Sequence, residues 1–201
     1  MSTVDLGPAA ERLSELVTGV DDSQLTARTP CPEYTLGDLI EHVGGLAQAF
    51  TAAANKSSGA LTSQAPRGDV TRLPADWRTR IPLDLKACAD AWRDPAAWAG
   101  MTRAGGVDLP GEVGGLVALD EITIHAWDIA VSTGQPYSAD EATLTAVRGF
   151  LASFSIPGAE DQRGEIFGPV IEVPDDAPLQ DRVIGLAGRD PGWATGRNSQ
   201  A

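Results

Sequence analysis

His42 and His125 are the only imidazole groups of the 201-residue chain. Glu121 precedes His125 by four positions, the spacing at which two side chains of a helix lie one above the other and can share a ligand. Two histidines and one glutamate are a ligand set of catalytic zinc sites, which keep a further position for water or substrate. Each histidine considered alone is more often an ordinary structural residue. Together the three residues form a candidate metal site.

The helix that must position Glu121 and His125 is predicted over residues 116–132. The pair lies on a narrow polar stripe that also holds Asp128 and Ser132, while most of the remaining circumference is apolar, which favours a central place in a bundle. Residues 104–147 contain neither Lys nor Arg, so no local cation neutralises these carboxylates. A divalent metal would resolve that conflict. The alternative is a metal-free bundle in which the stripe is the solvated face of a surface helix.

Apolar residues at helical spacing predict further helices around this one. Thr35 is predicted to cap the second of them, which weakens near Ala54 and carries His42 on the flank of its apolar face. A histidine at that border can point into a groove of the bundle. Ser138 and Glu141 are expected to form a capping box for the fifth helix. The fifth helix is predicted over residues 139–153, and the remaining ones over residues 4–20, 83–93 and 179–186.

The connectors are identified by Ser, Gly and Pro. Residues 57–75 are expected to form a surface loop, and residues 94–115 an irregular connector. An all-α domain over residues 1–155 is predicted, followed by a C-terminal extension over residues 156–201. The extension is expected to contain a short strand at 170–173, the last helix, and a disordered tail after Trp193.

Composition excludes several classes of function. A net charge of −13 repels nucleic acid and anionic membranes, so neither is expected as a partner. The start of the chain has no basic and apolar signal segment, and no window is long and apolar enough to span a membrane. Two cysteines, Cys31 and Cys88, are too few for a disulfide scaffold. We therefore expect a cytoplasmic protein with reduced thiols.

Three segments carry a resemblance to a known family: residues 29–43 with TPCPEYT and LIEHV, residues 120–134 with DEITIHAWDIA followed by TG, and residues 181–191 with DR and GRDP. In these segments the sequence resembles the actinobacterial DinB-like proteins, which are related to the N-terminal domain of mycothiol-dependent maleylpyruvate isomerase. The resemblance runs from about residue 5 to residue 193. The first two motifs are fairly specific together and weak singly.

The resemblance implies a DinB-like four-helix bundle, here with an extra helix and a short C-terminal extension. It also implies a divalent metal, usually zinc, held by His42, Glu121 and His125. In the thiol-dependent members the metal binds the mycothiol sulfur, so the resemblance implies a metal-dependent thiol transferase or isomerase that takes mycothiol and a small electrophile. The segment after the fifth helix is too short for the separate C-terminal domain of the isomerase, which argues against maleylpyruvate itself as substrate. The alternative is a non-catalytic metal-binding or interaction protein on the same bundle. A homodimer stays open.

Three other residues have two interpretations each, and a fourth has one. Asp128 could orient a metal ligand, but local capping or pairing is the more common role of such an Asp. Cys31 could be a fourth ligand or a nucleophile, but a structural thiol is favoured. Arg182 could bind an anionic substrate or the thiol cofactor, or be solvated. Trp127 points away from the stripe and is expected in the core.

Overall fold

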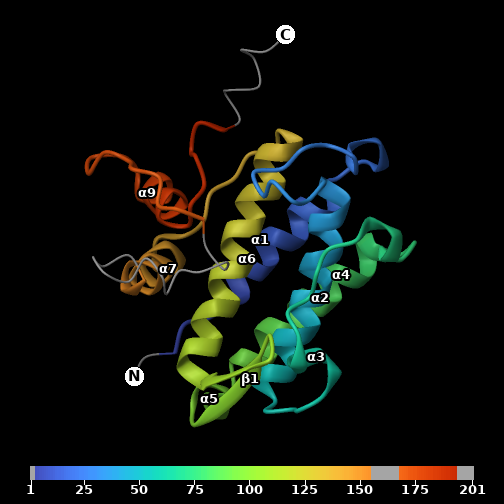
Figure 1. The fold of residues 1–201 in the computed structure, drawn as a ribbon, viewed down its shortest axis with the longest axis vertical. Coiled ribbons are helices and arrows are strands. Elements are labelled where there is room, and N and C mark those ends of the chain that lie inside the picture. The colour runs from blue at the N-terminus through green and yellow to red at the C-terminus, as the bar shows by residue number, and fades with distance from the viewer. Residues whose placement is uncertain (1–2, 155–167, 194–201) are drawn as a thin grey trace.

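Four helices form a bundle in the computed structural model, which describes residues 3–154 and 168–193. Helices α1 and α2 each pack against both α4 and α6, so the four close around a common core, and the all-α DinB-like fold is confirmed (Figure 1). Their fully buried side chains include Leu13, Leu16, Leu36, Leu39, Ile40, Leu85, Leu119 and Ile129. The helices are α1 (Gly7–Thr18), α2 (Leu36–Ala54), α4 (Trp77–Trp92) and α6 (Gly111–Thr133).

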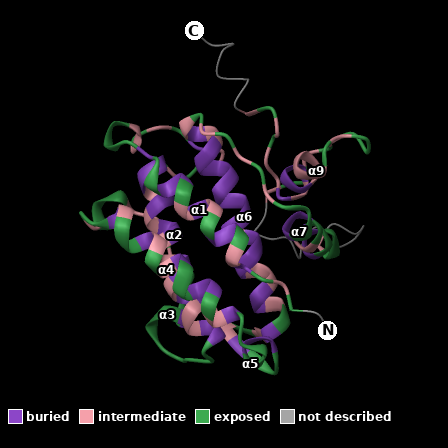
Figure 2. Cartoon of the chain, turned by 180° about the vertical axis from the view of Figure 1, so that it is seen from behind, coloured by how far each residue is buried: buried purple, intermediate pink, exposed green. Residues whose placement is uncertain are grey.

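Helix α6 is central because it is covered from two sides. Helices α7 (Glu141–Ser153) and α9 (Leu179–Leu186) pack on each other, and α7 packs on α6 (Figure 1). The view from behind shows the same order, with α6 between this pair and the rest of the bundle (Figure 2). Trp127 is 4% exposed and lies in the core, as expected. Within the stripe, His125, Asp128 and Ser132 are buried, so the solvated-face alternative is wrong.

Helix α2 begins and ends where the sequence indicates. The Thr35 hydroxyl accepts a hydrogen bond from the Asp38 backbone N–H, and the Asp38 carboxylate accepts one from the Thr35 N–H at 3.0 Å. This reciprocal capping satisfies two backbone donors that would otherwise be unpaired at the helix start. The helix then buries His42 on its way to Ala54.

Helix α4 starts earlier than predicted. The expected helix began after Pro82, but the observed helix begins at Trp77 and includes the proline. A proline removes one intrahelical hydrogen bond. Here Trp77 and Ile81 are 4% and 2% exposed, so burial of these large apolar side chains outweighs that loss.

The prediction of an irregular connector over residues 94–115 is also wrong. The segment forms α5 (Pro95–Trp98), a hairpin of β1 (Met101–Ala104) and β2 (Val107–Pro110), and the first residues of α6. The antiparallel strands pair Met101 with Pro110 and Ala104 with Val107, and two glycines with positive φ make the turn between them. Gly115 lies inside α6, where an added Cβ would approach the Trp98 ring to 2.6 Å. Its role is close packing and not a break in the helix.

Two smaller expectations also change, and a third is not tested. Asp140, and not Ser138, caps α7, because its carboxylate accepts the Thr143 N–H at 2.9 Å. Residues 170–173 are described without a strand; Ile171 donates its N–H to the Gly185 carbonyl of α9. The expected disordered tail lies outside the described residues.

The surface loop over residues 57–75 contains two short turns of helix, α3 (Ala60–Ser63) and η2 (Val70–Arg72). A further turn, η1 (Asp22–Gln24), follows α1. None of the helices in the described residues is long and apolar enough to cross a membrane.

Candidate metal centre

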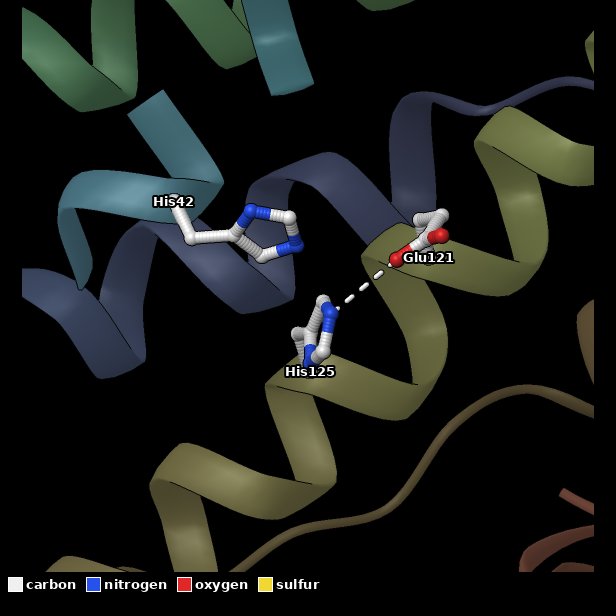
Figure 3. Close-up of side chains that lie close together, drawn as sticks. All are labelled: His42, Glu121 and His125. Atoms are coloured by element: carbon white, nitrogen blue, oxygen red, sulfur yellow. Dashed lines mark ion pairs between the residues drawn. The ribbon is translucent and has the colours of Figure 1, made fainter. Parts of the chain in front are cut away.

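Two adjacent helices bring the three predicted ligands together. His42 reaches from α2 toward Glu121 and His125, which lie one turn apart on α6 (Figure 3). One ligand atom from each residue lies within 4.8 Å of the other two. Seventy-nine positions separate His42 from Glu121, so only the packing of α2 on α6 creates this cluster.

The contacts within the cluster are close and directional. Nε2 of His125 lies 3.0 Å from Oε2 of Glu121, and Nδ1 of His125 lies 3.0 Å from Oδ2 of Asp128. The His42 and His125 rings meet edge to face, with centroids 5.1 Å apart. The Glu121 side chain keeps 25% of its surface exposed, whereas the His125 side chain keeps 7%, so Glu121 is the more accessible of the two.

The pKa values of the α6 pair move in opposite directions. Burial disfavours the charged form of His125, but hydrogen bonds to Asp128 and Glu121 outweigh it and raise the pKa of His125 to about 9. Burial likewise opposes ionisation of Glu121, but the hydrogen bond and positive charge of His125 prevail and lower the pKa of Glu121. The metal-free pair is therefore an imidazolium and a carboxylate.

The pKa of His42 shifts in the opposite direction to that of His125. Burial, followed by the positive charge of His125, lowers the pKa of His42 to about 4. Its Nδ1 is buried and no hydrogen bond of good geometry reaches it among the described residues. A neutral imidazole is the form that binds a metal ion, so His42 is prepared as a ligand at neutral pH.

The donor set fits a zinc ion. Bonds of about 2.0–2.2 Å in a tetrahedron place two ligand atoms about 3.3–3.6 Å apart. The 3.0 Å separation of His125 and Glu121 is already close to this spacing, while the overall spread of 4.8 Å requires an approach of roughly 1 Å by the set that includes His42. Nitrogen and carboxylate donors suit zinc and similar divalent ions.

Asp128 pairs locally with His125, as expected, and also contacts a residue from a distant part of the chain. Its side chain is 0% exposed, and it contacts both Nδ1 of His125 and the guanidinium of Arg189. A carboxylate that accepts Nδ1–H leaves Nε2 of His125 to face the cluster. Asp128 is therefore placed where it can orient the candidate ligand.

Arg189 is the site residue that sequence reasoning missed. Arg182 was the arginine singled out from the last helix, yet no described contact joins Arg182 to the cluster, and its Nε is buried without a hydrogen bond. Arg189 belongs to the GRDP motif at residues 188–191, which is the only signal in the sequence that points to it. Nothing in that motif indicates that Arg189 contacts α6.

Cys31 lies near the cluster without being part of it. The groups whose charges act on its thiol include Arg189, Asp128 and Glu121, and burial raises the pKa of Cys31. A thiol with a raised pKa is a poor nucleophile at neutral pH. Cys31 is also absent from the cluster of potential ligand atoms. The structure thus gives no support to its role as a fourth ligand.

A tyrosine and a loop pack against His42. The Tyr34 ring lies 5.3 Å from the His42 ring, and the Tyr34 hydroxyl accepts a hydrogen bond from the Gly68 N–H. A Cβ at Gly68 would lie 2.2 Å from the Asp38 carbonyl oxygen, so only glycine allows the loop to approach α2 this closely. This packing limits the freedom of the His42 ring.

We expect the contribution of the two histidines to the free energy of unfolding of the metal-free protein to be largest near pH 6.5. The pKa of His125 is raised from 6.5 to about 9, so its stabilisation is complete below pH 6.5 and is lost as the pH rises to about 9. The pKa of His42 is lowered to about 4, so its contribution is lost as the pH falls from 6.5 to about 4. Each change is on the order of 3 kcal/mol.

Urea unfolding in the presence of a chelator, measured from pH 4 to pH 10, checks this expectation. His125→Gln should remove the decline on the alkaline side, and His42→Gln should reduce the decline on the acidic side. A free energy of unfolding of the wild-type protein that stays level between pH 6.5 and pH 9 would contradict the assignment of His125.

The chain is similar to known proteins over most of its length. A family model described as the mycothiol maleylpyruvate isomerase N-terminal domain matches residues 6–130. Two uncharacterized proteins of Mycobacterium tuberculosis, from strains CDC 1551 and H37Rv, are 32% identical over 186 residues, which is 90% of this chain and 93% of each relative.

Solved structures support the same fold. The crystal structure of the mycothiol-dependent maleylpyruvate isomerase matches with a TM-score of 0.54 and 18% identity. The match covers 73% of this chain and 66% of the isomerase chain, and a histidine-to-alanine variant of that enzyme matches equally. At this identity the likeness concerns the fold alone.

Proposed function

The chain belongs to the family of the mycothiol maleylpyruvate isomerase N-terminal domain, and on that premise we propose that it is a metal-dependent enzyme that transfers or uses a small thiol. Its cosubstrate in this proposal is mycothiol, and its second substrate is a small electrophile. The observation that carries the proposal is the convergence of His42, Glu121 and His125, whose ligand atoms lie within 4.8 Å of one another.

The charges around the cluster favour an anionic ligand beside the metal. The carboxylates of Glu121 and Asp128 and the guanidinium of Arg189 sum to −1 when both histidines are neutral. A divalent cation changes this sum to +1, which an anionic ligand such as a thiolate neutralises. When bound, zinc would lower the pKa of a thiol that coordinates it, so that the nucleophilic thiolate persists at neutral pH.

The residues of the chain have separate roles in this proposal. His42 and His125 provide neutral nitrogen ligands, and Glu121 provides the anionic oxygen ligand. Asp128 accepts the Nδ1–H of His125 and so aims Nε2 at the cluster. The exposed part of Glu121 marks the side from which the thiol and the electrophile enter.

The test is the zinc-loaded protein incubated with mycothiol and a chromogenic aromatic halide as the electrophile. We expect enzymatic formation of the thioether, with release of halide and of the thiol proton, and a rate at least about 100-fold lower in Glu121→Gln, since a carboxylate ligand is lost. Glu112→Gln is the matched control, because Glu112 is exposed in the first turn of the same helix. A zinc-loaded wild type no faster than Glu121→Gln with several thiols and electrophiles would favour the non-catalytic metal-binding protein instead.

A further inference from the structure

The C-terminal segment sends one charged side chain into the bundle. Arg189 follows α9, fifty-nine residues beyond the end of the matched domain at residue 130. Its Nε donates to Oδ1 of Asp128 at 3.3 Å, and its Nη2 donates to Oδ2 of the same carboxylate at 3.2 Å. The segment outside the matched domain therefore contacts α6 next to the metal cluster.

This ion pair differs from those on the surface of the protein. The Arg189 side chain is 15% exposed and the Asp128 side chain is 0% exposed, whereas the Arg103–Asp108 pair is 41% and 68% exposed. Two parallel hydrogen bonds between a guanidinium and a carboxylate determine the orientation of both groups. Arg189 therefore controls which way the Asp128 carboxylate faces.

The same carboxylate oxygen connects Arg189 to the predicted metal ligand. Oδ2 of Asp128 lies 3.2 Å from Nη2 of Arg189 and 3.0 Å from Nδ1 of His125. If the carboxylate turned, the hydrogen bond that holds the imidazole ring would be lost. The orientation of His125 therefore depends on a residue that touches neither the ring nor the metal.

The backbone around Arg189 is built for this contact. Gly188 ends α9 with a φ of +77°, a conformation that other residues rarely adopt, and a Cβ there would lie 2.9 Å from Gly168. The turn lets the Arg189 N–H donate to the Ile184 carbonyl at 3.0 Å, which closes the helix end. A short turn with a defined backbone conformation therefore positions the guanidinium of Arg189.

We propose that Arg189 is a positioning residue of the metal centre, which holds Asp128 so that His125 presents Nε2 to the metal. The C-terminal segment is then a functional part of the centre and not only an appendage to the bundle. This inference rests on the metal centre of the proposed function.

The test measures zinc affinity by competition with a chromogenic chelator, on untagged full-length protein. Arg189→Ala should weaken zinc binding about 10-fold, the lower end of the effect seen when a partner of a metal ligand is removed. Arg189→Lys should recover only part of this loss, because an ammonium keeps the charge but not the paired hydrogen bonds. Arg182→Ala is the matched control from the same segment and should change the affinity less than twofold.

Two further measurements separate positioning from general destabilisation. Val183→Ala removes two methyl groups from a fully buried side chain of α9 that forms no hydrogen bond with Asp128, and it should keep the wild-type zinc affinity although it lowers the stability. In the metal-free protein, the Nδ1 proton of His125 should give a protected NMR signal, and Arg189→Ala should accelerate its exchange with water at least about tenfold, because the carboxylate that accepts it is no longer held.

The outcomes distinguish the inference from the proposed function. A wild type that binds one zinc ion, together with an Arg189→Ala variant of unchanged affinity, overturns the positioning role and leaves the metal centre intact. Equal losses in Arg189→Ala and Val183→Ala overturn it as well, because stability alone then explains the loss. A wild type that binds no zinc contradicts the proposed function, and exchange of the His125 proton still decides the role of Arg189.

Discussion

His125→Ala should reduce the zinc content of the purified protein from about one equivalent to less than about 0.2 equivalents. Structural zinc sites bind with about 10–16 kcal/mol shared among four ligands, so one ligand contributes about 2.5–4 kcal/mol, or roughly 10²–10³-fold in affinity. His42→Ala should have a similar effect, because it removes a ligand from the facing helix. Among the described residues, the cluster contains no fourth His, Cys, Asp or Glu that could replace the lost ligand.

The measurement is elemental analysis of protein purified without a histidine tag and dialysed against metal-free buffer. Glu112→Gln, an exposed change on the same helix, should retain the full equivalent. If the wild type holds less than about 0.2 equivalents and His125→Ala does not change this value, the metal centre is wrong, and with it both the thiol-dependent enzyme and the metal-binding protein.

Asp128→Ala should lower the free energy of unfolding of the metal-free protein by about 3–5 kcal/mol. The carboxylate is 0% exposed and is contacted by two positively charged groups, the imidazolium of His125 and the guanidinium of Arg189. Removing it leaves both charges largely buried without their partner, and breaking a buried pair in this way costs far more than breaking an exposed one. For a domain whose total stability is about 5–15 kcal/mol, this is a severe loss.

Urea unfolding near pH 6.5, with a chelator present, measures this change. Asp108→Ala is the control, since it breaks the exposed pair with Arg103, and it should cost no more than about 1 kcal/mol. If Asp128→Ala and Asp108→Ala destabilise the protein equally, the buried network contributes no more than a surface ion pair.

Local sequence patterns predicted the helices that depend on local chemistry. Thr35 caps α2 as expected because a hydroxyl beside a backbone N–H acts within one turn. The start of α4 was missed because Pro82 is a local signal against a helix, whereas the burial of Trp77 and Ile81 is a property of the whole core. The start of α6 was missed for the same reason. Gly115 is a local signal against a helix, but its lack of a side chain allows close packing against Trp98, a residue of another helix.

The candidate ligands could be named from the sequence because their types are rare in it. With only two histidines in the chain, and one of them a turn away from a glutamate, His42, Glu121 and His125 are the natural combination. The absence of Lys and Arg from residues 104–147 was a further signal, since it leaves the carboxylates of α6 without a nearby cation in sequence. Residue type and helical spacing thus determined the chemistry.

Only the tertiary structure shows which residues surround the candidate ligands. Asp128 and Arg189 are sixty-one positions apart, and their contact depends on α9 packing on α7 and on α7 packing on α6. Helical periodicity describes which residues share a face of one helix, but it does not say which distant side chain meets that face. The sequence therefore identified the candidate ligands, whereas the packing of the C-terminal segment decided that a largely buried arginine contacts the carboxylate beside one of them.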